Sequence, residues 1–229
     1  MRIKWIGQSG YIIDTGTNEI AIDPYLSDSV NRVAGRPRML PVPVKPEDIK
    51  ANAIICTHNH LDHLDPDSVS AMDENLHFIT TAEGKNELDS LGRHNVTVLE
   101  PGKSITLGDV CITAVFAKHT VEAFGVILKS CGYTLYFSGD TLFDPKLFEI
   151  SDFNPDIAFI CINGKLGNMD VNQAVTVAKK IGAEINVPNH YGMFLSNTED
   201  PAKFTGRLTN AFETEFNRWY EVGEILTEK

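Results

Sequence analysis

Residues 57–63 read Thr-His-Asn-His-Leu-Asp-His, directly after an apolar run at residues 52–56 that predicts a buried strand. A turn at the end of that strand lets alternate side chains converge, and imidazole together with carboxylate suits zinc, iron or manganese. The window holds three of the chain's seven histidines, so a merely polar, histidine-rich loop is a poor explanation. The segment therefore predicts a metal site that uses His58, His60, Asp62 and His63.

Three further residues occupy the same kind of position. His119, Asp140 and His190 each lie just beyond an apolar run that predicts a strand. Open α/β sheets place their ligand sites beyond the ends of strands, so these side chains are candidates for the same site. Taken singly, a capping aspartate or a hydrogen-bonded loop histidine would also explain each of them. His77 and His94 lack such a position and are interpreted as structural.

The periodicity of the whole chain is mixed, which indicates an α/β layered domain with helices outside the sheets. Short apolar runs bounded by glycine and proline predict strands. The predicted strands cover residues 3–6, 11–14, 19–23, 52–56, 77–81, 96–99, 104–107, 110–116, 125–129, 134–138, 156–162 and 184–187. The predicted helices begin at Pro66 or cover residues 82–91, 172–181 and 204–220.

Two segments need separate interpretation. The last predicted helix carries an apolar stripe at helical spacing, which indicates core packing rather than cofactor binding. The stripe consists of Phe204, Leu208, Phe212, Phe216 and Trp219. Residues 24–47 form a long connection rich in proline and arginine, and such a loop is either functional or a solvated crossing.

Composition limits the classes of function. The chain has 229 residues, enough for one large domain with its own core, and a net charge of −11. So acidic a surface repels nucleic acids and anionic membranes. The net charge of the whole chain does not exclude a local basic pocket for a small anion. Apolar runs are too short for a membrane span, polar residues interrupt any signal-peptide core, and the four cysteines are scattered. These features predict a cytoplasmic protein with mostly buried, reduced thiols.

The His-x-His-x-Asp-His motif at 58–63, His119, Ser-Gly-Asp-Thr at 138–141 and His190 together resemble the metallo-β-lactamase superfamily. The resemblance runs through essentially the whole chain. It implies a four-layered αββα sandwich in a single domain, 1–229, with halves at roughly 1–120 and 121–229. It also implies two divalent metal ions, zinc or manganese, with iron as a further candidate. The first ion would be held by His58, His60 and His119, the second by Asp62, His63 and His190, and Asp140 would bridge both.

A narrower resemblance, to the L-ascorbate-6-phosphate lactonase branch, rests on five short motifs. They are Gly-Gln-Ser-Gly at 7–10, Asp-Pro-Tyr-Leu-Ser-Asp-Ser at 23–29, Ile-Asn-Gly at 162–164, Gly-Asn-Met at 167–169 and Pro-Asn-His-Tyr-Gly-Met-Phe at 188–194. The resemblance implies a hydrolase in which metal-activated hydroxide opens a small lactone, with phosphorylated sugar lactones among the candidates. Relatives suggest a homo-oligomer.

Three other functions are weighed against the lactonase. A phosphodiesterase or nuclease uses the same metal pair, but the acidic surface argues against nuclease action. Di-iron oxidoreductases of this superfamily typically carry glutamate where this chain has His60, which favours hydrolysis. A metal-stabilised interaction domain would be expected to have lost ligands, and all seven are present.

Roles beyond metal binding are less closely determined by the sequence. Asp62 would either orient the hydroxide and carry its proton, or act as a ligand only. Hydrogen bonds to substrate are predicted from Asn163, Lys165, Asn168 and Tyr191, for which a turn or ordinary packing is the alternative. The candidates for a substrate phosphate are Lys118, Arg36 and Arg38.

Overall fold

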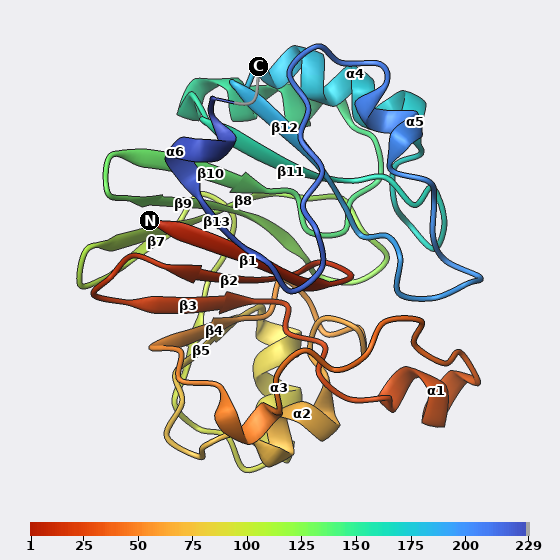
Figure 1. Ribbon diagram of the computed structural model, residues 1–229. Coiled ribbons are helices and arrows are strands. Elements are labelled where there is room, and N and C mark those ends of the chain that lie inside the picture. The colour runs from red at the N-terminus through yellow and green to blue at the C-terminus, as the bar shows by residue number, and fades with distance from the viewer. Residues whose placement is uncertain (228–229) are drawn as a thin grey trace.

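The computed structural model describes residues 1–227, and residues 228–229 of the predicted domain lie outside that part. Two mixed sheets pack face to face, and helices cover their outer faces (Figure 1). Helices α4 (Val171–Ile181) and α5 (Ala202–Thr205) cover one sheet, and α2 (Pro66–Ala71) and α3 (Ala82–Ser90) cover the other. The predicted four-layered αββα sandwich is confirmed.

The first sheet has the order β13-β1-β2-β3-β4-β5-β6. Its pairs are antiparallel from β13 to β3 and parallel from β3 to β6. Its strands are β1 (Arg2–Gly7), β2 (Gly10–Asp14), β3 (Glu19–Ile22), β4 (Ala53–Ile55), β5 (Phe78–Thr80), β6 (Val96–Val98) and β13 (Trp219–Glu221). Apart from Glu19 at the start of β3, strands β3 and β4 are apolar and buried, as expected where parallel strands are covered on both faces.

The second sheet has the order β12-β11-β10-β9-β8-β7. It is antiparallel from β7 to β10 and parallel from β10 to β12. Its strands are β7 (Ser104–Leu107), β8 (Val110–Phe116), β9 (Phe124–Ser130), β10 (Tyr133–Phe137), β11 (Ile157–Cys161) and β12 (Ile185–Asn189). Strands β7 and β8 belong to the second sheet although they precede residue 120, the predicted boundary between the halves. Strand β13 belongs to the first sheet although it lies near the C-terminus.

The main core lies between the two sheets. The rings of Phe137 and Phe159 stack with centroids 4.4 Å apart, and the Tyr11 ring from the opposite sheet lies 4.7 Å from that of Phe159. Offset aromatic pairs of this kind add to the hydrophobic stabilisation from burial. Residues of both sheets thus share one buried core beneath the loops that carry the predicted ligands.

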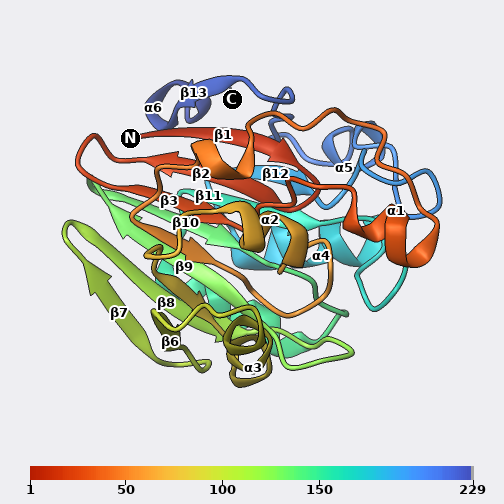
Figure 2. The ribbon, with the colours of Figure 1, turned by 90° about the horizontal axis from the view of Figure 1, so that it is seen from below.

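Short helices complete the fold. Helix α4 begins with a capping box formed by Asp170 and Gln173, and it ends at Gly182, which is left-handed with a φ of 71°. The remaining helical segments are α1 (Ser29–Ala34), α6 (Val222–Ile225), and the 3₁₀ segments η1 (Pro46–Asp48) and η2 (Pro145–Phe153). Helix α1 lies in the long connection that was predicted without secondary structure. Figures 1 and 2 both place α1 at one end of the molecule.

The predicted helix at 204–220 is wrong. Only α5 is helical there, and the following chain runs along the edge of β12. The Asn186 amide donates to the Asn210 carbonyl at 2.9 Å, and the Phe212 amide donates to the Asn186 carbonyl at 3.0 Å. Gly206 and several threonine and asparagine residues have weak helix propensity, so this sheet edge outcompetes a helix. The apolar stripe still packs on the core, as predicted.

The four cysteines are free, and no helix within residues 1–227 is long and apolar enough to cross a membrane. Cys56 and Cys161 are buried, in agreement with the prediction. Cys131 is exposed, because the tight turn between β9 and β10 places it at the surface.

Candidate metal centre

All seven predicted ligands lie at the carboxyl ends of strands from both sheets. The loop after β4 supplies four of them, and the loops after β8, β10 and β12 supply one each. Their ligand atoms form two groups, within each of which the atoms lie no more than 4.8 Å apart. One group contains His58, His60, His119 and Asp140, and the other contains Asp62, His63 and His190.

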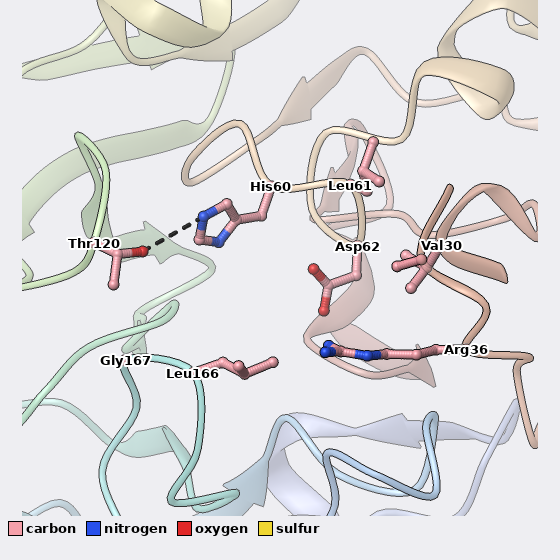
Figure 3. A pocket seen from close by; sticks show the side chains of 9 residues that line it. Val30, Arg36, His60, Leu61, Asp62, Thr120, Leu166 and Gly167 are labelled. Atoms are coloured by element: carbon pink, nitrogen blue, oxygen red, sulfur yellow. Dashed lines mark hydrogen bonds between the residues drawn. The ribbon is translucent and has the colours of Figure 1, made fainter. Parts of the chain in front are cut away.

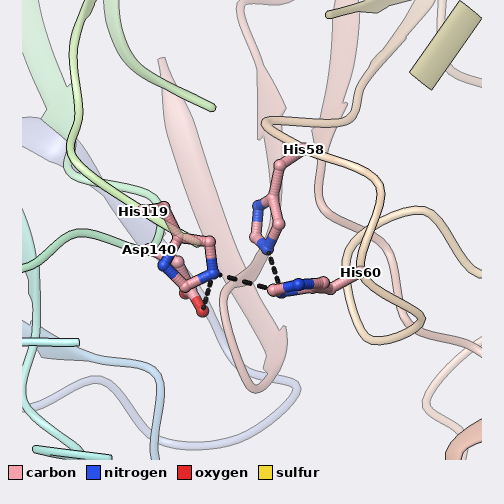
Figure 4. Close-up of side chains that lie close together, drawn as sticks. All are labelled: His58, His60, His119 and Asp140. Atoms are coloured by element: carbon pink, nitrogen blue, oxygen red, sulfur yellow. Dashed lines mark hydrogen bonds and ion pairs between the residues drawn. The ribbon is translucent and has the colours of Figure 1, made fainter. Parts of the chain in front are cut away.

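In the first group, three imidazoles point toward a common centre (Figure 4). His60 Nδ1 lies 3.0 Å from His58 Nε2 and 3.1 Å from His119 Nε2. Nitrogen ligands of a tetrahedral zinc ion, each about 2.0–2.1 Å from the metal, are separated by roughly 3.3 Å. The three nitrogens are therefore spaced as ligands of one cation would be.

A glycine in the 164–168 loop orients His119. The His119 Nδ1–H donates to the Gly167 carbonyl at 3.1 Å, which leaves Nε2 free to bind a metal. Gly167 has a φ of 92°, and a Cβ there would lie 2.9 Å from the His119 ring. Only glycine allows the backbone to approach the imidazole this closely.

The two carboxylate oxygens of Asp140 face different groups. Asp140 Oδ1 lies 3.2 Å from His190 Nε2 and 3.3 Å from His63 Nε2, and Oδ2 lies 3.7 Å from His119 Nε2. In the second group, Asp62 Oδ2 lies 3.5 Å from His190 Nε2. Asp140 is thus placed where a bridging carboxylate has to be, although its metal-binding role stays a prediction.

The site is chemically suited to cations. The buried His63 Nε2 and Asp140 Oδ1 atoms lie 3.3 Å apart but without the geometry of a hydrogen bond, and leaving such atoms without one is costly. Neutral imidazoles and carboxylates also form the ligand set that zinc, manganese and iron accept. The residues therefore fit two divalent metal ions, whose identity the ligand set leaves open.

The two groups differ in their electrostatics. Burial lowers the pKa of His58, His60 and His119, which favours the neutral, ligating imidazole. Burial acts in the same direction on His190, but the carboxylates of Asp140 and Asp62 outweigh it and raise its pKa to about 9. A cation in the second group therefore displaces protons when it binds.

Sequence reasoning missed Gln8 as a site residue. The Gln8 Nε2–H donates to Asp62 Oδ2 at 2.7 Å, and Nε2 lies 3.2 Å from His190 Nε2. Gln8 has a φ of 54°, unusual for a residue other than glycine, and the Trp5 Nε1–H donates to its carbonyl. Gln8 belongs to the Gly-Gln-Ser-Gly motif that was noted in the sequence. Nothing in that motif indicated contact with Asp62, 54 residues away.

Asp23 was also missed, because it was interpreted only as the end of a strand. The His63 Nδ1–H donates to Asp23 Oδ2 at 2.8 Å, while the amide and the hydroxyl of Thr57 both donate to the same carboxylate. A carboxylate behind a histidine fixes the tautomer and the ring orientation of a metal ligand. Asp23 therefore positions His63.

Asp23→Asn should lower the metal affinity of the second group by about 10- to 100-fold, the usual effect of losing such a partner. Asparagine replaces one carboxylate oxygen by an NH₂ donor, which would face either the Thr57 amide N–H or the two donors, His63 Nδ1–H and the Thr57 hydroxyl, that share Oδ2, so at least one acceptor is lost. Metal titration by calorimetry measures the effect. Asp65→Asn is the matched control, since Asp65 is equally buried and accepts from Ser27 without touching a predicted ligand. Equal metal affinity in both variants would refute the role of Asp23.

A cavity of about 460 Å³ opens above the metal centre. His60 and Asp62 form its floor, and the predicted substrate contacts are not among its lining residues in the described chain. The Asn163 amide donates to Asn197, the Lys165 ammonium donates to the Ser196 carbonyl, and the Tyr191 ring stacks on Trp5. The 164–168 loop contributes to the cavity through Leu166 and Gly167 instead.

Among the three phosphate candidates, the cavity wall includes only Arg36. The Arg38 guanidinium donates to backbone carbonyls, those of Ser27 and Leu40 among them, and so holds the long connection together. Lys118 forms an exposed ion pair with Asp144 at 3.2 Å.

The chain was compared with known proteins. It is 29% identical over 242 residues to a UPF0173 metal-dependent hydrolase of Bacillus mycoides, with 99% of each chain covered. It is 25% identical over 224 residues to a UPF0173 metal-dependent hydrolase of Archaeoglobus fulgidus, with 89% of each covered. A metallo-β-lactamase fold protein of Bacillus subtilis superposes with a TM-score of 0.74 at 18% identity, covering 96% of this chain and 99% of the other.

The narrower resemblance to the lactonase branch stays a prediction, because the two UPF0173 relatives are named metal-dependent hydrolases without a substrate. The family model described as the β-lactamase superfamily domain matches residues 18–191, well over half of the chain. The αββα sandwich and the two His/Asp groups at its strand ends agree with this match. The chain therefore belongs to the metallo-β-lactamase superfamily.

Proposed function

We propose that the protein is a metal-dependent hydrolase that opens small lactones. The observation that carries the proposal is the pair of His/Asp groups, with Asp140 close to histidines of both, beside a cavity that His60 and Asp62 help to line. Relatives that match the chain from end to end are named metal-dependent hydrolases, which supports the general reaction class. The lactone rests on the narrower sequence resemblance.

Two divalent cations, when bound, supply Lewis acidity that lowers the pKa of water and stabilises developing negative charge. The chain itself supplies position and proton transfer. Asp62 lies both in the second group and in the cavity wall, with Oδ2 held by Gln8. Its carboxylate is therefore placed to orient a water molecule or to accept its proton. Burial alone would raise the pKa of Asp62, but His63 and His190 outweigh it and keep that pKa low.

The size of the cavity and the net charge of the chain favour a small substrate. A cavity of about 460 Å³ lies within the range of small-molecule sites, about 300–1,000 Å³. A net charge of −11 disfavours polynucleotides. A phosphodiesterase acting on a small diester is the second candidate, because the same two groups of ligands suit phosphoryl chemistry.

A parallel assay tests the function. We expect hydrolysis of small lactones, L-ascorbate 6-phosphate among them, by protein supplied with manganese and with zinc. Bis-p-nitrophenyl phosphate and a short single-stranded RNA run beside the lactones, and His58→Ala protein controls for contaminating hydrolases. If the phosphodiester or the RNA is cleaved far faster than every lactone with both metals, the lactonase proposal fails and the phosphodiesterase replaces it.

A further inference from the structure

The cavity above the metal centre is mostly aliphatic. Three of its walls are formed by Val30 of α1, by Leu61 and by Leu166 (Figure 3). Such a lining favours an apolar part of a ligand, since burying hydrocarbon against it removes apolar surface from water.

Leu166 lies in the cavity wall with an exposed apolar side chain and an unfavourable backbone conformation. Its side chain is 56% exposed, and its φ of 52° is rarely adopted by residues with a branched side chain. The adjacent Gly167 carbonyl accepts from His119, so Leu166 is the neighbour of a residue that contacts a predicted metal ligand. Strain and exposed apolar surface of this kind are typical of ligand sites.

Arg36 supplies the positive charge of the cavity wall. In Figure 3 its guanidinium extends across the cavity on the side of Asp62. Within residues 1–227 it makes no hydrogen bond or ion pair, whereas Arg32 pairs with Asp67 and Lys118 with Asp144. A half-buried guanidinium without a protein acceptor has all its donors available to a ligand. Its planar fork matches a carboxylate or a phosphate bidentately.

From these observations we propose that the site selects small amphipathic anions. The carboxylate or phosphate of the substrate pairs with Arg36, and its hydrocarbon part lies against Leu166, Val30 and Leu61. The scissile carbonyl is thereby directed to the floor formed by His60 and Asp62. This inference rests on the proposed hydrolase function for the reaction, but the recognition itself is a binding property. Arg36 and Leu166 are specificity-determining residues in this account.

Binding of hydrolytically inert ligands tests the inference apart from catalysis. Isothermal titration of metal-loaded protein uses hexanoate and hexyl phosphate as amphipathic anions, 1-hexanol as the neutral analogue and acetate as the short one. The parent chain should bind hexanoate or hexyl phosphate at least about 10-fold more tightly than 1-hexanol, as hydrogen bonds to charged groups require. The same titration on chelator-treated protein separates recognition by Arg36 from binding of the anion to the metals.

Arg36→Gln should weaken binding of the amphipathic anions by about 10-fold or more, with partial recovery in Arg36→Lys. Leu166→Ser should weaken hexanoate binding several-fold and leave acetate unchanged, because only hexanoate reaches the apolar wall. Lys179→Gln and Leu195→Ser are the matched controls, since both residues are exposed and neither lines the cavity. Both controls should bind like the parent chain.

Unchanged anion affinity in Arg36→Gln, or equal losses in the control variants, would overturn the inference. Absence of hydrolysis on every lactone, together with Arg36-dependent binding, would refute the proposed function and leave the recognition intact. Rapid lactone hydrolysis with identical KM in the parent and Arg36→Gln would refute the recognition and leave the hydrolase.

Discussion

Asp140→Asn should produce a folded protein that hydrolyses its substrate at least about 100-fold more slowly than the parent chain. The carboxylate is almost fully buried, and its two oxygens face different groups of ligands. Asparagine keeps the shape but removes a negative charge that reduces the repulsion between two cations, which is strong at short range even at an effective dielectric constant of about 20. Both metal affinity and rate should therefore fall.

Elemental analysis and the rate of the best lactone substrate measure this effect together. Asp144→Asn is the control, because Asp144 lies four residues away in an exposed ion pair with Lys118. Parent-like metal content and turnover in Asp140→Asn would show that Asp140 merely ends the loop after β10.

The second large effect is selective loss of metal from one group. His58→Ala should remove the cation of the first group, and His190→Ala that of the second, because each variant deletes a nitrogen that belongs to one group. Each should lose about one metal equivalent and, if both cations are needed, most of the hydrolytic activity.

Anomalous diffraction at the metal's absorption edge identifies which position is empty in each variant. His94→Ala is the control, since His94 is exposed and pairs with Asp89 rather than with the site. If both variants lose the metal at the same position, or if neither variant loses metal, the assignment of ligands to two groups is wrong.

The residues of the two His/Asp groups could be picked out of the sequence because their signal is local. Four of them share one six-residue window, and the other three follow strands whose apolar pattern is clear. The apolar pattern of neighbouring residues indicates where each strand ends. The carboxyl ends of parallel strands then lie at the same edge of a sheet. The loop after β4 is therefore the easiest part of the site to predict.

The supporting residues depend on contacts between distant segments. Gln8 meets Asp62 across 54 residues, and Asp23 meets His63 across 40. Nothing in the residues beside Gln8 or Asp23 encodes these distances. The predicted helix at 204–220 failed for a related reason, since the edge of β12 offered backbone partners that helical spacing alone does not reveal.

The cavity wall was equally hidden from the sequence. Arg36 was one of three basic candidates, and only the fold separates it from Arg38, whose guanidinium donates to backbone carbonyls. Leu166 carried no signal at all, because an isolated leucine in a glycine-rich loop is indistinguishable from a loop residue that packs on the core.

The metal content of the parent chain tests the central claim most directly. Protein purified without chelator and saturated with manganese or zinc, then analysed by elemental mass spectrometry, should contain two equivalents per chain. Saturation at one equivalent, held through residues other than His58, His60, His119, Asp140, Asp62, His63 and His190, would contradict the two-metal centre and the hydrolase built on it.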